Sequence, residues 1–221
     1  QNTGRAFAKG IMIAADIFII ILLFTLFAFS HTLLASNKTK LALAEKLGAK
    51  IAFYRLFYNL SSLLFFIVFY AVAPKPYVIV YDLLFPFDII IFALQVLSLI
   101  GLVWATKPIN LKEFLGTAQI ERYLRGEYKV EDLDERQTLK IEGAFKMVRH
   151  PIYFFSILFL GFRPTMSLFY LVMFLCIVIY FCVGSIFEER KLIETFGDEY
   201  QEYQLRVPRI FPLSITRTKL K

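Results

Sequence analysis

The chain has 221 residues, of which 58% are hydrophobic and 17% aromatic, and its mean hydropathy is +0.61. A soluble domain is nearer half apolar, and several apolar runs here approach the roughly 20 residues that cross a bilayer. The composition therefore excludes an ordinary soluble protein and predicts one polytopic membrane domain over residues 1–221. The formal net charge of +7 suits nucleic acid only on a soluble surface, because basic residues in a membrane protein mainly mark its topology. We expect no nucleic-acid partner.

The few cysteines and histidines predict no metal site. Cys176 and Cys182 share one apolar run and stand six residues apart, so they do not stack on one face of a helix. The chain has only two Cys and two His, and the histidines, His31 and His150, are distant in sequence from each other and from the cysteines. Neither a disulfide framework nor a zinc or haem site follows from this pattern.

The first apolar run covers residues 11–34 and is broken by few polar residues, among them Ser30, His31 and Thr32. It is too long for the core of a signal peptide and lacks a cleavage site of small residues, so it predicts a retained membrane helix. Because the first residue is Gln1, we expect the chain to be a mature or trimmed form.

A basic loop is predicted over residues 36–50, which carry four lysines against one glutamate. The second membrane helix is expected at 51–73. Pro74 and Pro76 end it, because proline cannot continue the hydrogen-bond ladder of a helix.

The third membrane helix is expected at 85–105, where Lys107 and Pro108 stop it. A long polar region, 106–150, follows. Its first part has helical apolar spacing and predicts an amphipathic helix along the membrane surface, carrying Leu111, Phe114, Leu115 and Ala118. Its second part, 126–142, is charged and non-periodic, which indicates a solvated loop or a short helix.

A hairpin of apolar helices is predicted near the end of the chain. The first arm, 151–162, has only 12 residues, about 18 Å of helix, against a hydrocarbon core of about 30 Å. It must be lengthened by its flanks or must not cross fully. Residues 161–165 form the expected turn, and 167–187 return. The fold class is therefore all-α, a bundle of about five membrane helices with a C-terminal helical hairpin and a polar tail.

The distribution of charge predicts the orientation. With five crossings, one side of the membrane holds only four of the 25 basic residues, namely Arg5, Lys9, Lys75 and Arg163. Lys and Arg concentrate on the cytoplasmic side. We therefore expect an inner or plasma membrane protein with its N-terminus outside and its C-terminus cytoplasmic, and with 106–150 and 188–221 in the cytoplasm.

Two polar clusters flank the C-terminal hairpin, so both are expected at one membrane surface. Arg149 and His150 precede Pro151, and this pattern fits either a plain helix start with interfacial cations or an anion-binding site with charge-assisted bonds. Glu188 and Glu189 follow the second apolar arm. Acids at a helix C-terminus oppose its dipole, so local stability does not explain them. Neighbours on a helix point about 100° apart, so we expect one of the two to face a pocket.

These clusters belong to a longer pattern that resembles a known superfamily. The motifs are R-H-P-x-Y (149–153), E-E-x-x-L (188–192), F-G-x-x-Y-x-x-Y (196–203) and V-P-R-x-x-P (207–212). They resemble the C-terminal half of the isoprenylcysteine carboxyl methyltransferase and phospholipid methyltransferase superfamily, which are small membrane enzymes that use S-adenosylmethionine. The segments 30–36, 54–60 and 113–119 resemble its NnrU and methanethiol S-methyltransferase branch.

The resemblance implies methyl transfer from S-adenosylmethionine to a small thiol or a lipid-borne acceptor at the cytoplasmic membrane face. It implies catalytic roles for Arg149 and Glu188, and membrane lipids as surroundings. The implied cofactor-binding residues are Arg149, His150, Tyr153, Glu188, Glu189 and Tyr200. His31 is implied at a substrate entrance together with Arg55 and Asn59, although these three are equally explained as contacts between helices. The chain has no G-x-G-x-x-G, so a soluble Rossmann methyltransferase is excluded.

One position departs from the superfamily pattern. R-H-P-x-Y is usually followed by x-Gly, and here that position is Phe155. Glycine permits the close approach of a ligand or a helix, so a benzyl group there either reshapes or closes a pocket. The alternative hypothesis is therefore a catalytically degenerate subunit that assembles with partner subunits in a membrane complex. A small transporter is disfavoured, because neither a repeat nor a pair of broken helices is visible.

Overall fold

The computed structural model describes residues 2–129 and 139–212. Contacts group the chain into two compact units. The first unit is Gln1–Pro76 with Ile109–Thr138, and the second is Tyr77–Pro108 with Leu139–Lys221. Most of the predicted loop at 126–142, and the tail beyond residue 212, lie outside the described residues.

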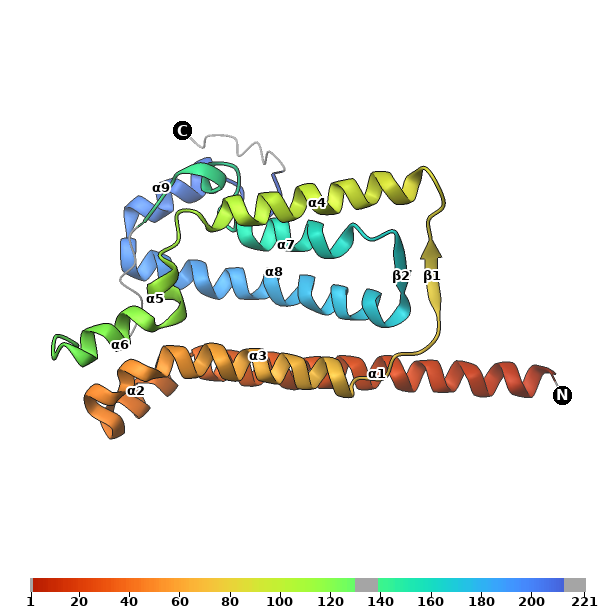
Figure 1. The fold of residues 1–221 in the computed structure, drawn as a ribbon, viewed down its shortest axis with the longest axis horizontal. Helices are drawn as coiled ribbons and strands as arrows, with labels where there is room; N and C mark the ends of the chain where they lie inside the picture. Colours follow the sequence, from red (N-terminus) through yellow and green to blue (C-terminus); the bar gives the residue numbers. More distant parts are fainter. Residues whose placement is uncertain (1, 130–138, 213–221) are drawn as a thin grey trace, which may run out of the picture. The chain divides into compact units, whose positions relative to one another are not determined.

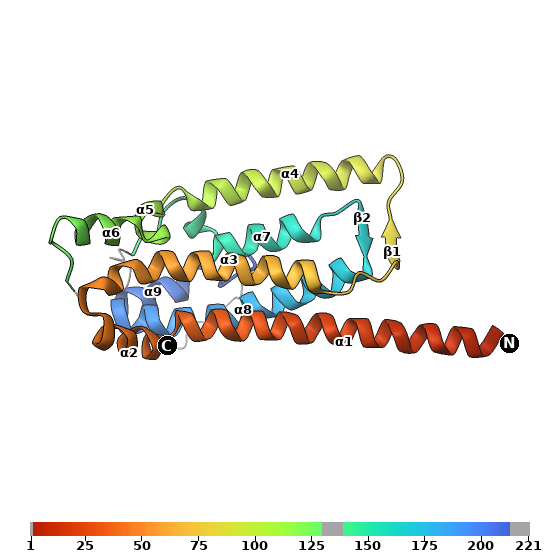
Figure 2. The same ribbon diagram turned by 60° about the horizontal axis from the view of Figure 1, so that its bottom comes forward.

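Two long helices form the body of the first unit. Helix α1 (Asn2–Ala35) and helix α3 (Tyr54–Val72) lie side by side in both views (Figures 1 and 2). Phe24 and Phe69 pack edge to face between them, with ring centroids 5.6 Å apart. Helix α1 starts at Asn2 rather than at the predicted residue 11, so the residues before the apolar run are helical as well. Pro74 and Pro76 follow the end of α3, as predicted.

The prediction of a loop at 36–50 is wrong, because most of this segment is helical. Helix α2 (Asn37–Leu47) begins where the Ser36 hydroxyl accepts a hydrogen bond from the Thr39 amide at 3.2 Å, which is an N-cap contact. It ends at Gly48, whose φ is +54°, and the 3₁₀ helix η1 (Gly48–Phe53) leads into α3. The lysines were interpreted as a sign of a loop, although the other residues of the segment, mainly Leu and Ala, favour a helix.

The predicted amphipathic helix after residue 110 is present but broken. Helices α5 (Leu111–Leu115) and α6 (Thr117–Leu124) meet at Gly116, whose φ is +92°. A Cβ atom at Gly116 would lie 2.6 Å from the backbone nitrogen of Leu56 on α3. Only glycine allows both this backbone conformation and this close approach. The turn is therefore set against α3.

Three helices of the second unit run alongside one another in Figure 1: α4 (Phe87–Thr106), α7 (Pro151–Gly161) and α8 (Leu168–Phe196). The 3₁₀ helix η3 (Gly143–Lys146) precedes α7, and α9 (Asp198–Arg206) follows α8. A small antiparallel sheet, not predicted from the sequence, pairs β1 (Ile79–Asp82) with β2 (Thr165–Ser167). It joins the segment before α4 to the turn of the α7–α8 hairpin. The prediction missed it because strands of three and four residues show too little alternation.

The predicted all-α membrane fold is confirmed. Within residues 2–129 and 139–212, four helical segments are long and apolar enough to cross a membrane: Thr3–Ala35, Asn37–Val72, Phe87–Thr106 and Leu168–Phe196. Large apolar side chains cover their outer surfaces; Ile89, Leu97 and Ile100 on α4 are each more than half exposed, as expected where lipid replaces water. Helix α7, which corresponds to the predicted membrane helix at 151–162, has 11 residues, about 16 Å. It is therefore short, as its sequence predicted.

Candidate functional site

The two polar clusters of the hairpin meet, with the C-terminal segment between them. The backbone amides of Arg149 and His150 donate to the carbonyls of Pro208 and Arg209, each at 2.9 Å. This short ladder fastens the segment after α9 to the start of α7. Because α8 ends at the same place, the carboxylates of its last turns face the side chains that precede Pro151. The predicted convergence of the two clusters is present in the structure.

Glu189 is the centre of this cluster and its carboxylate is only 3% exposed. One oxygen accepts from Arg149 Nε at 2.7 Å and from His150 Nε2 at 3.2 Å. The other accepts from Arg149 Nη2 at 3.1 Å, Gln204 Nε2 at 3.0 Å and Arg209 Nε at 3.1 Å. Five donors fill both oxygens, so Glu189 joins α7, α8, α9 and the C-terminal segment.

Arg149 is the main partner of Glu189 and its side chain is 8% exposed. Its Nε and Nη2 atoms form a bidentate pair with the carboxylate, a geometry specific to arginine. Its Nη1 atom donates to the carbonyls of Gln204 at 3.0 Å and Val207 at 2.5 Å, at the end of α9. All three guanidinium nitrogens are thus bonded to the protein. The geometry favours a positioning role for Arg149.

Glu188 has the opposite environment, because its side chain is 51% exposed. Its carboxylate accepts a hydrogen bond from the Tyr153 hydroxyl and lies 3.3 Å from His150 Nδ1. These contacts fix the carboxylate on one side and leave the other side open. The structure therefore separates the two glutamates: Glu189 is enclosed, and Glu188 is the one that a ligand can reach.

His150 lies between the two glutamates and is buried. Each ring nitrogen faces a carboxylate, Nε2 toward Glu189 and Nδ1 toward Glu188. Burial opposes a charge on the ring, but the hydrogen bonds that the ring makes to both carboxylates outweigh it and raise the pKa of His150 above its ordinary value. The His150 ring thus lies between the enclosed carboxylate of Glu189 and the open carboxylate of Glu188.

The tyrosines of the motifs fall into two groups. Tyr153 stacks on Phe181 at 4.3 Å and lies parallel to the His150 ring at 5.3 Å, so its hydroxyl is held at Glu188. Tyr200 and Tyr203 are buried, 2% and 4% exposed, and their burial raises the pKa of both phenols. The predicted cofactor contact of Tyr200 is not tested by this arrangement, in which it packs with Tyr203 and Val207 beneath the cluster.

The predicted entrance residues lie in the first unit, and two of them hold the α5–α6 turn. Arg55 Nε and Asn59 Nδ2 donate to the Phe114 carbonyl at 3.0 and 2.9 Å. This carbonyl is at the end of α5, where helical partners are missing. His31 instead bonds Tyr58 on α3 at 2.7 Å and Ser62 at 2.8 Å. Arg55 and Asn59 thus bond the α5–α6 turn, whereas the hydrogen bonds of His31 go to α3.

A second polar contact of the first unit surrounds Glu113, which is 8% exposed. Arg122 donates to both its carboxylate oxygens, at 2.5 and 3.3 Å, and Gln119 Nε2 donates to it at 3.1 Å. These bonds hold α5 against α6 across Gly116. The segment 113–119, which resembles the methanethiol S-methyltransferase branch, is therefore a folded corner in the structure.

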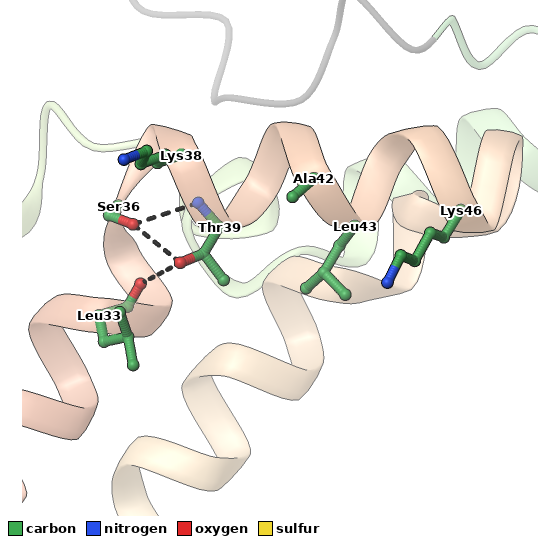
Figure 3. Close-up of a pocket in the computed structure, with 7 residues that line it drawn as sticks. All are labelled: Leu33, Ser36, Lys38, Thr39, Ala42, Leu43 and Lys46. Carbon is green, nitrogen blue, oxygen red and sulfur yellow. Dashed lines mark hydrogen bonds between the residues drawn. The ribbon is translucent and has the colours of Figure 1, made fainter.

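A shallow hollow of about 380 Å³ is formed by the corner between α1 and α2 (Figure 3). Its walls come from the α1 end and from one side of α2: Leu33, Ser36, Lys38, Thr39, Ala42, Leu43 and Lys46. The Ser36 and Thr39 side chains in it bond each other and the α1 end. It offers two ammonium groups but neither a carboxylate nor an aromatic ring, so it is a poor match for an adenosyl group.

A search of curated proteins gives relatives that share one name. The chain is 34% identical over 204 residues to methanethiol S-methyltransferase 1 of Bradyrhizobium diazoefficiens, a match that covers 90% of this chain and 68% of the relative. The chain belongs to the methanethiol S-methyltransferase family. Methanethiol S-methyltransferases of Pseudomonas deceptionensis and Crocosphaera subtropica match over shorter stretches. The first is 34% identical over 35% of this chain and 32% of the relative, and the second is 30% identical over 57% and 47%.

No family model matches the chain, and no solved structure matches it. The family assignment confirms the resemblance noted for the N-terminal segments and the C-terminal motifs. It rests on sequence over nearly the whole chain, and the fold described above supplies the geometry.

The departure at Phe155 has a structural explanation in this member of the family. The Phe155 ring points toward α4, where a Cβ atom on Gly101 would lie 2.2 Å from Phe155 Cε1. Trp104 lies edge to face with the same ring, 6.3 Å away. Gly101 on α4 thus leaves the space that the Phe155 ring fills. Phe155 belongs to the α4–α7 contact, whereas Tyr153 faces α8.

Several residues of these clusters were missed by the sequence analysis. Gln204 and Arg209 both bond Glu189, and Tyr58 with Ser62 holds His31. The signal for the second pair was available: Tyr58 and Ser62 are four residues apart on one helix, so they share a face. Gln204 had no signal, because polar residues on a solvated helix are common.

Proposed function

We propose that this protein is an integral membrane methyltransferase that transfers a methyl group from S-adenosylmethionine to a small thiol. The observation that carries the proposal is the half-exposed carboxylate of Glu188, fixed by Tyr153 and His150 on a base built around Glu189. Family membership supplies the reaction, because the relatives are named for methyl transfer to methanethiol. A rigid base with one open charged group is what ligand positioning requires.

The cofactor carries an ammonium group, ribose hydroxyls and a carboxylate. Glu188 would accept hydrogen bonds from the ammonium or from the hydroxyls. For the carboxylate we favour Arg209 over Arg149 and His150, because its side chain is 44% exposed and its Nε holds Glu189. Arg149 and His150 then position Glu188 and Arg209 rather than touch the cofactor. We thus keep the predicted site at 149–153 and 188–189 but propose different roles for its residues.

When bound, S-adenosylmethionine supplies an electrophilic methyl group on a sulfonium. The chemistry left to the protein is to hold donor and acceptor in line, to exclude water, and to remove the proton of the thiol. A membrane helix bundle suits a small apolar acceptor, which partitions into lipid. The fixed charges of Glu188 and Arg209 contribute orientation.

The location of the reaction is part of the proposal. The four apolar segments make this an integral membrane protein, and the excess of Lys and Arg in 36–50, 106–150 and 188–221 supports a cytoplasmic site in an inner or plasma membrane. A lipid-borne acceptor and a role as a complex subunit stay predictions. The hypothesis of a complex subunit was based on Phe155, which was expected to reshape or close a pocket. In the structure the Phe155 ring fills space against Gly101.

The test is methyl transfer by the full chain purified in detergent. Radiolabelled S-adenosylmethionine is supplied with methanethiol, with a prenylcysteine and with a phospholipid amine in separate reactions. We expect labelled product with the thiol, and loss of this product in Glu188→Gln, with Glu194→Gln on the exposed face of α8 as the matched control. Labelled product only with the prenylcysteine or the phospholipid amine would show that the acceptor is lipid-borne. Labelled product in none of the three reactions would contradict the proposed methyltransferase activity.

A further inference from the structure

The hollow between α1 and α2 is a cavity of the first unit that the proposed methyl transfer does not use. Its volume is about 380 Å³, and all of its lining residues fall within 33–46. In Figure 3 the side chains of Thr39, Leu43 and Lys46 point to one side of α2, and Leu33 at the end of α1 lies on that side as well. The hollow therefore combines apolar side chains with positively charged ones.

Hydrogen bonds within the corner hold the shape of the hollow. Thr39 Oγ1 donates its proton to the Leu33 carbonyl at 2.8 Å. Because that proton is used, the Ser36 hydroxyl is the donor in the 2.9 Å bond between Ser36 Oγ and Thr39 Oγ1. Ser36 Oγ in turn accepts from the Thr39 amide at 3.2 Å. Both hydroxyl protons are thus used inside the corner, so the donors that the hollow presents to a ligand are its ammonium groups.

Lys38 and Lys46 supply these ammonium groups. They stand eight residues apart on α2 with Ala42 midway, so all three lie on one face of the helix. Eight residues span about 12 Å along a helix axis, and the long, flexible lysine stems can bring both ammonium groups to one anion between them. Both lysines are exposed. With the part of the chain that the structure describes, neither forms a hydrogen bond or an ion pair.

The positive charge of the hollow is not balanced by an acid of its own. The described residues that line the hollow include neither Asp nor Glu. Helix α2 carries one acid, Glu45, and this residue is outside the lining. The hollow is therefore suited to an anion.

The position of the hollow in the fold indicates what kind of anion it meets. The hollow begins at Leu33, and the membrane span Thr3–Ala35 ends two residues later. A stripe of exposed apolar side chains leads from Leu33 back along α1, with the spacing of one helix face: Leu22, Leu26 and Phe29. A positively charged hollow at the end of such a stripe matches a lipid, whose acyl chains are apolar and whose phosphate lies at the membrane surface.

We propose that the hollow binds one anionic phospholipid, with its phosphate between the ammonium groups of Lys38 and Lys46 and an acyl chain along Leu33 and Phe29. Lysines beside a membrane helix attract anionic lipids, and the braced corner adds a fixed shape. A zwitterionic lipid fits less well, because its own ammonium group meets two others. A small soluble anion has no chain to cover Leu33. The lipid is a ligand here rather than the methyl acceptor, and its binding is independent of methyl transfer.

The test counts the lipids that the full chain retains in native mass spectrometry from detergent micelles. Phosphatidylglycerol and phosphatidylcholine with the same acyl chains are titrated separately, and the fraction of chain that keeps one lipid gives each affinity. The variants are Lys46→Gln and the double variant Lys38→Gln with Lys46→Gln. Lys50→Gln is the matched control, because this exposed lysine lies on η1, just after α2, and does not line the hollow. Unfolding temperatures are measured on all variants.

We expect the wild type to bind phosphatidylglycerol at least about five-fold more tightly than phosphatidylcholine. The attraction of one lysine for an anionic surface corresponds to about five-fold in affinity. Lys46→Gln should therefore weaken phosphatidylglycerol binding about five-fold and the double variant about 25-fold, at unchanged unfolding temperatures. Lys50→Gln should stay within about two-fold of the wild type.

Three results would overturn the site. Equal affinities for the two lipids, or a double variant that binds phosphatidylglycerol as the wild type does, would remove the role of the two ammonium groups. An equal loss in Lys50→Gln would show diffuse attraction to the basic segment instead of a site. Displacement of the lipid by an equal concentration of soluble glycerol phosphate would make the ligand a soluble anion. Methyl transfer, which is measured separately, is not affected by any of these results.

Discussion

Glu188 and Glu189 are consecutive in the chain, yet the first carboxylate is 51% exposed and the second is 3% exposed. The turn of the α-helix between them directs one toward the Arg149 guanidinium and the other toward an open side. The two therefore differ in what their removal costs. Glu189 is part of the protein framework, and Glu188 is the residue that we propose to contact the ligand.

Replacement of the two glutamates should separate stability from binding. Glu189→Gln leaves Arg149 buried without its counter-charge, and loss of one partner of a buried pair costs about 3–5 kcal/mol. Glu188→Gln removes an exposed acceptor and should cost less than about 1 kcal/mol. Unfolding of the detergent-solubilised protein, followed by intrinsic fluorescence, measures both. Equal unfolding temperatures for the two variants would contradict the assignment.

The pH dependence of stability should carry the signature of His150. Its pKa is raised in the folded protein above the ordinary value of 6.5, so the imidazolium contributes stability that is fully present below about pH 6.5. This contribution is lost as the pH rises through the higher, folded value. His150→Gln should therefore flatten the decline in unfolding temperature as the pH rises above about 6.5. A variant that declines as steeply as the wild type would show that the ring is neutral in the folded protein.

The Phe155–Gly101 contact predicts a pair of compensating substitutions. Gly101→Ala introduces a methyl group 2.2 Å from the ring and should destabilise the protein by about 1–3 kcal/mol through overpacking. The addition of Phe155→Leu should recover part of that loss. Cofactor affinity should stay within about two-fold of wild type in the folded variants, because the ring faces α4. Loss of cofactor binding in Phe155→Leu alone would place the ring in the ligand site instead.

The tautomer of His31 can be observed directly. The chain has two histidines, so ¹⁵N-histidine labelling of His150→Gln leaves one imidazole. We expect the chemical shifts of a neutral ring protonated at Nδ1. In the same background Ser62→Ala removes the acceptor that fixes this tautomer, and a mixture of tautomers should appear. A ring protonated at Nε2 in the parent protein would contradict these contacts, in which the Ser62 hydroxyl donates to the Tyr58 carbonyl at 2.7 Å and so accepts from His31 Nδ1.

The sequence predicted the membrane helices and the meeting of the two polar clusters, because both follow from local pattern. Apolar runs and prolines marked the ends of α3 and α4 within a few residues. The hairpin between residues 151 and 187 required its two ends to lie together. What failed locally was α2, whose lysines were interpreted as a loop although Ser36 supplies an N-cap.

The division of roles within the site was beyond prediction from the sequence. Helix geometry indicated that only one of the adjacent glutamates faces a pocket, but the choice depends on Arg149, which lies 40 residues away. The meaning of Phe155 likewise depends on Gly101 of another helix. Such pairings are tertiary, and one sequence contains no local signal for them.

The most direct test of the account is calorimetric binding of S-adenosylmethionine to the full chain in detergent, compared between wild type and Glu188→Gln. Glu194→Gln serves as control, since it removes the same charge from an exposed position of the same helix. We predict saturable binding in wild type and control, and an affinity at least about 10-fold lower in Glu188→Gln, the cost of one charge-assisted bond, at an unchanged unfolding temperature. Equal affinities in all three proteins, or no binding in a folded wild type, would contradict the central claim that Glu188 holds the methyl donor.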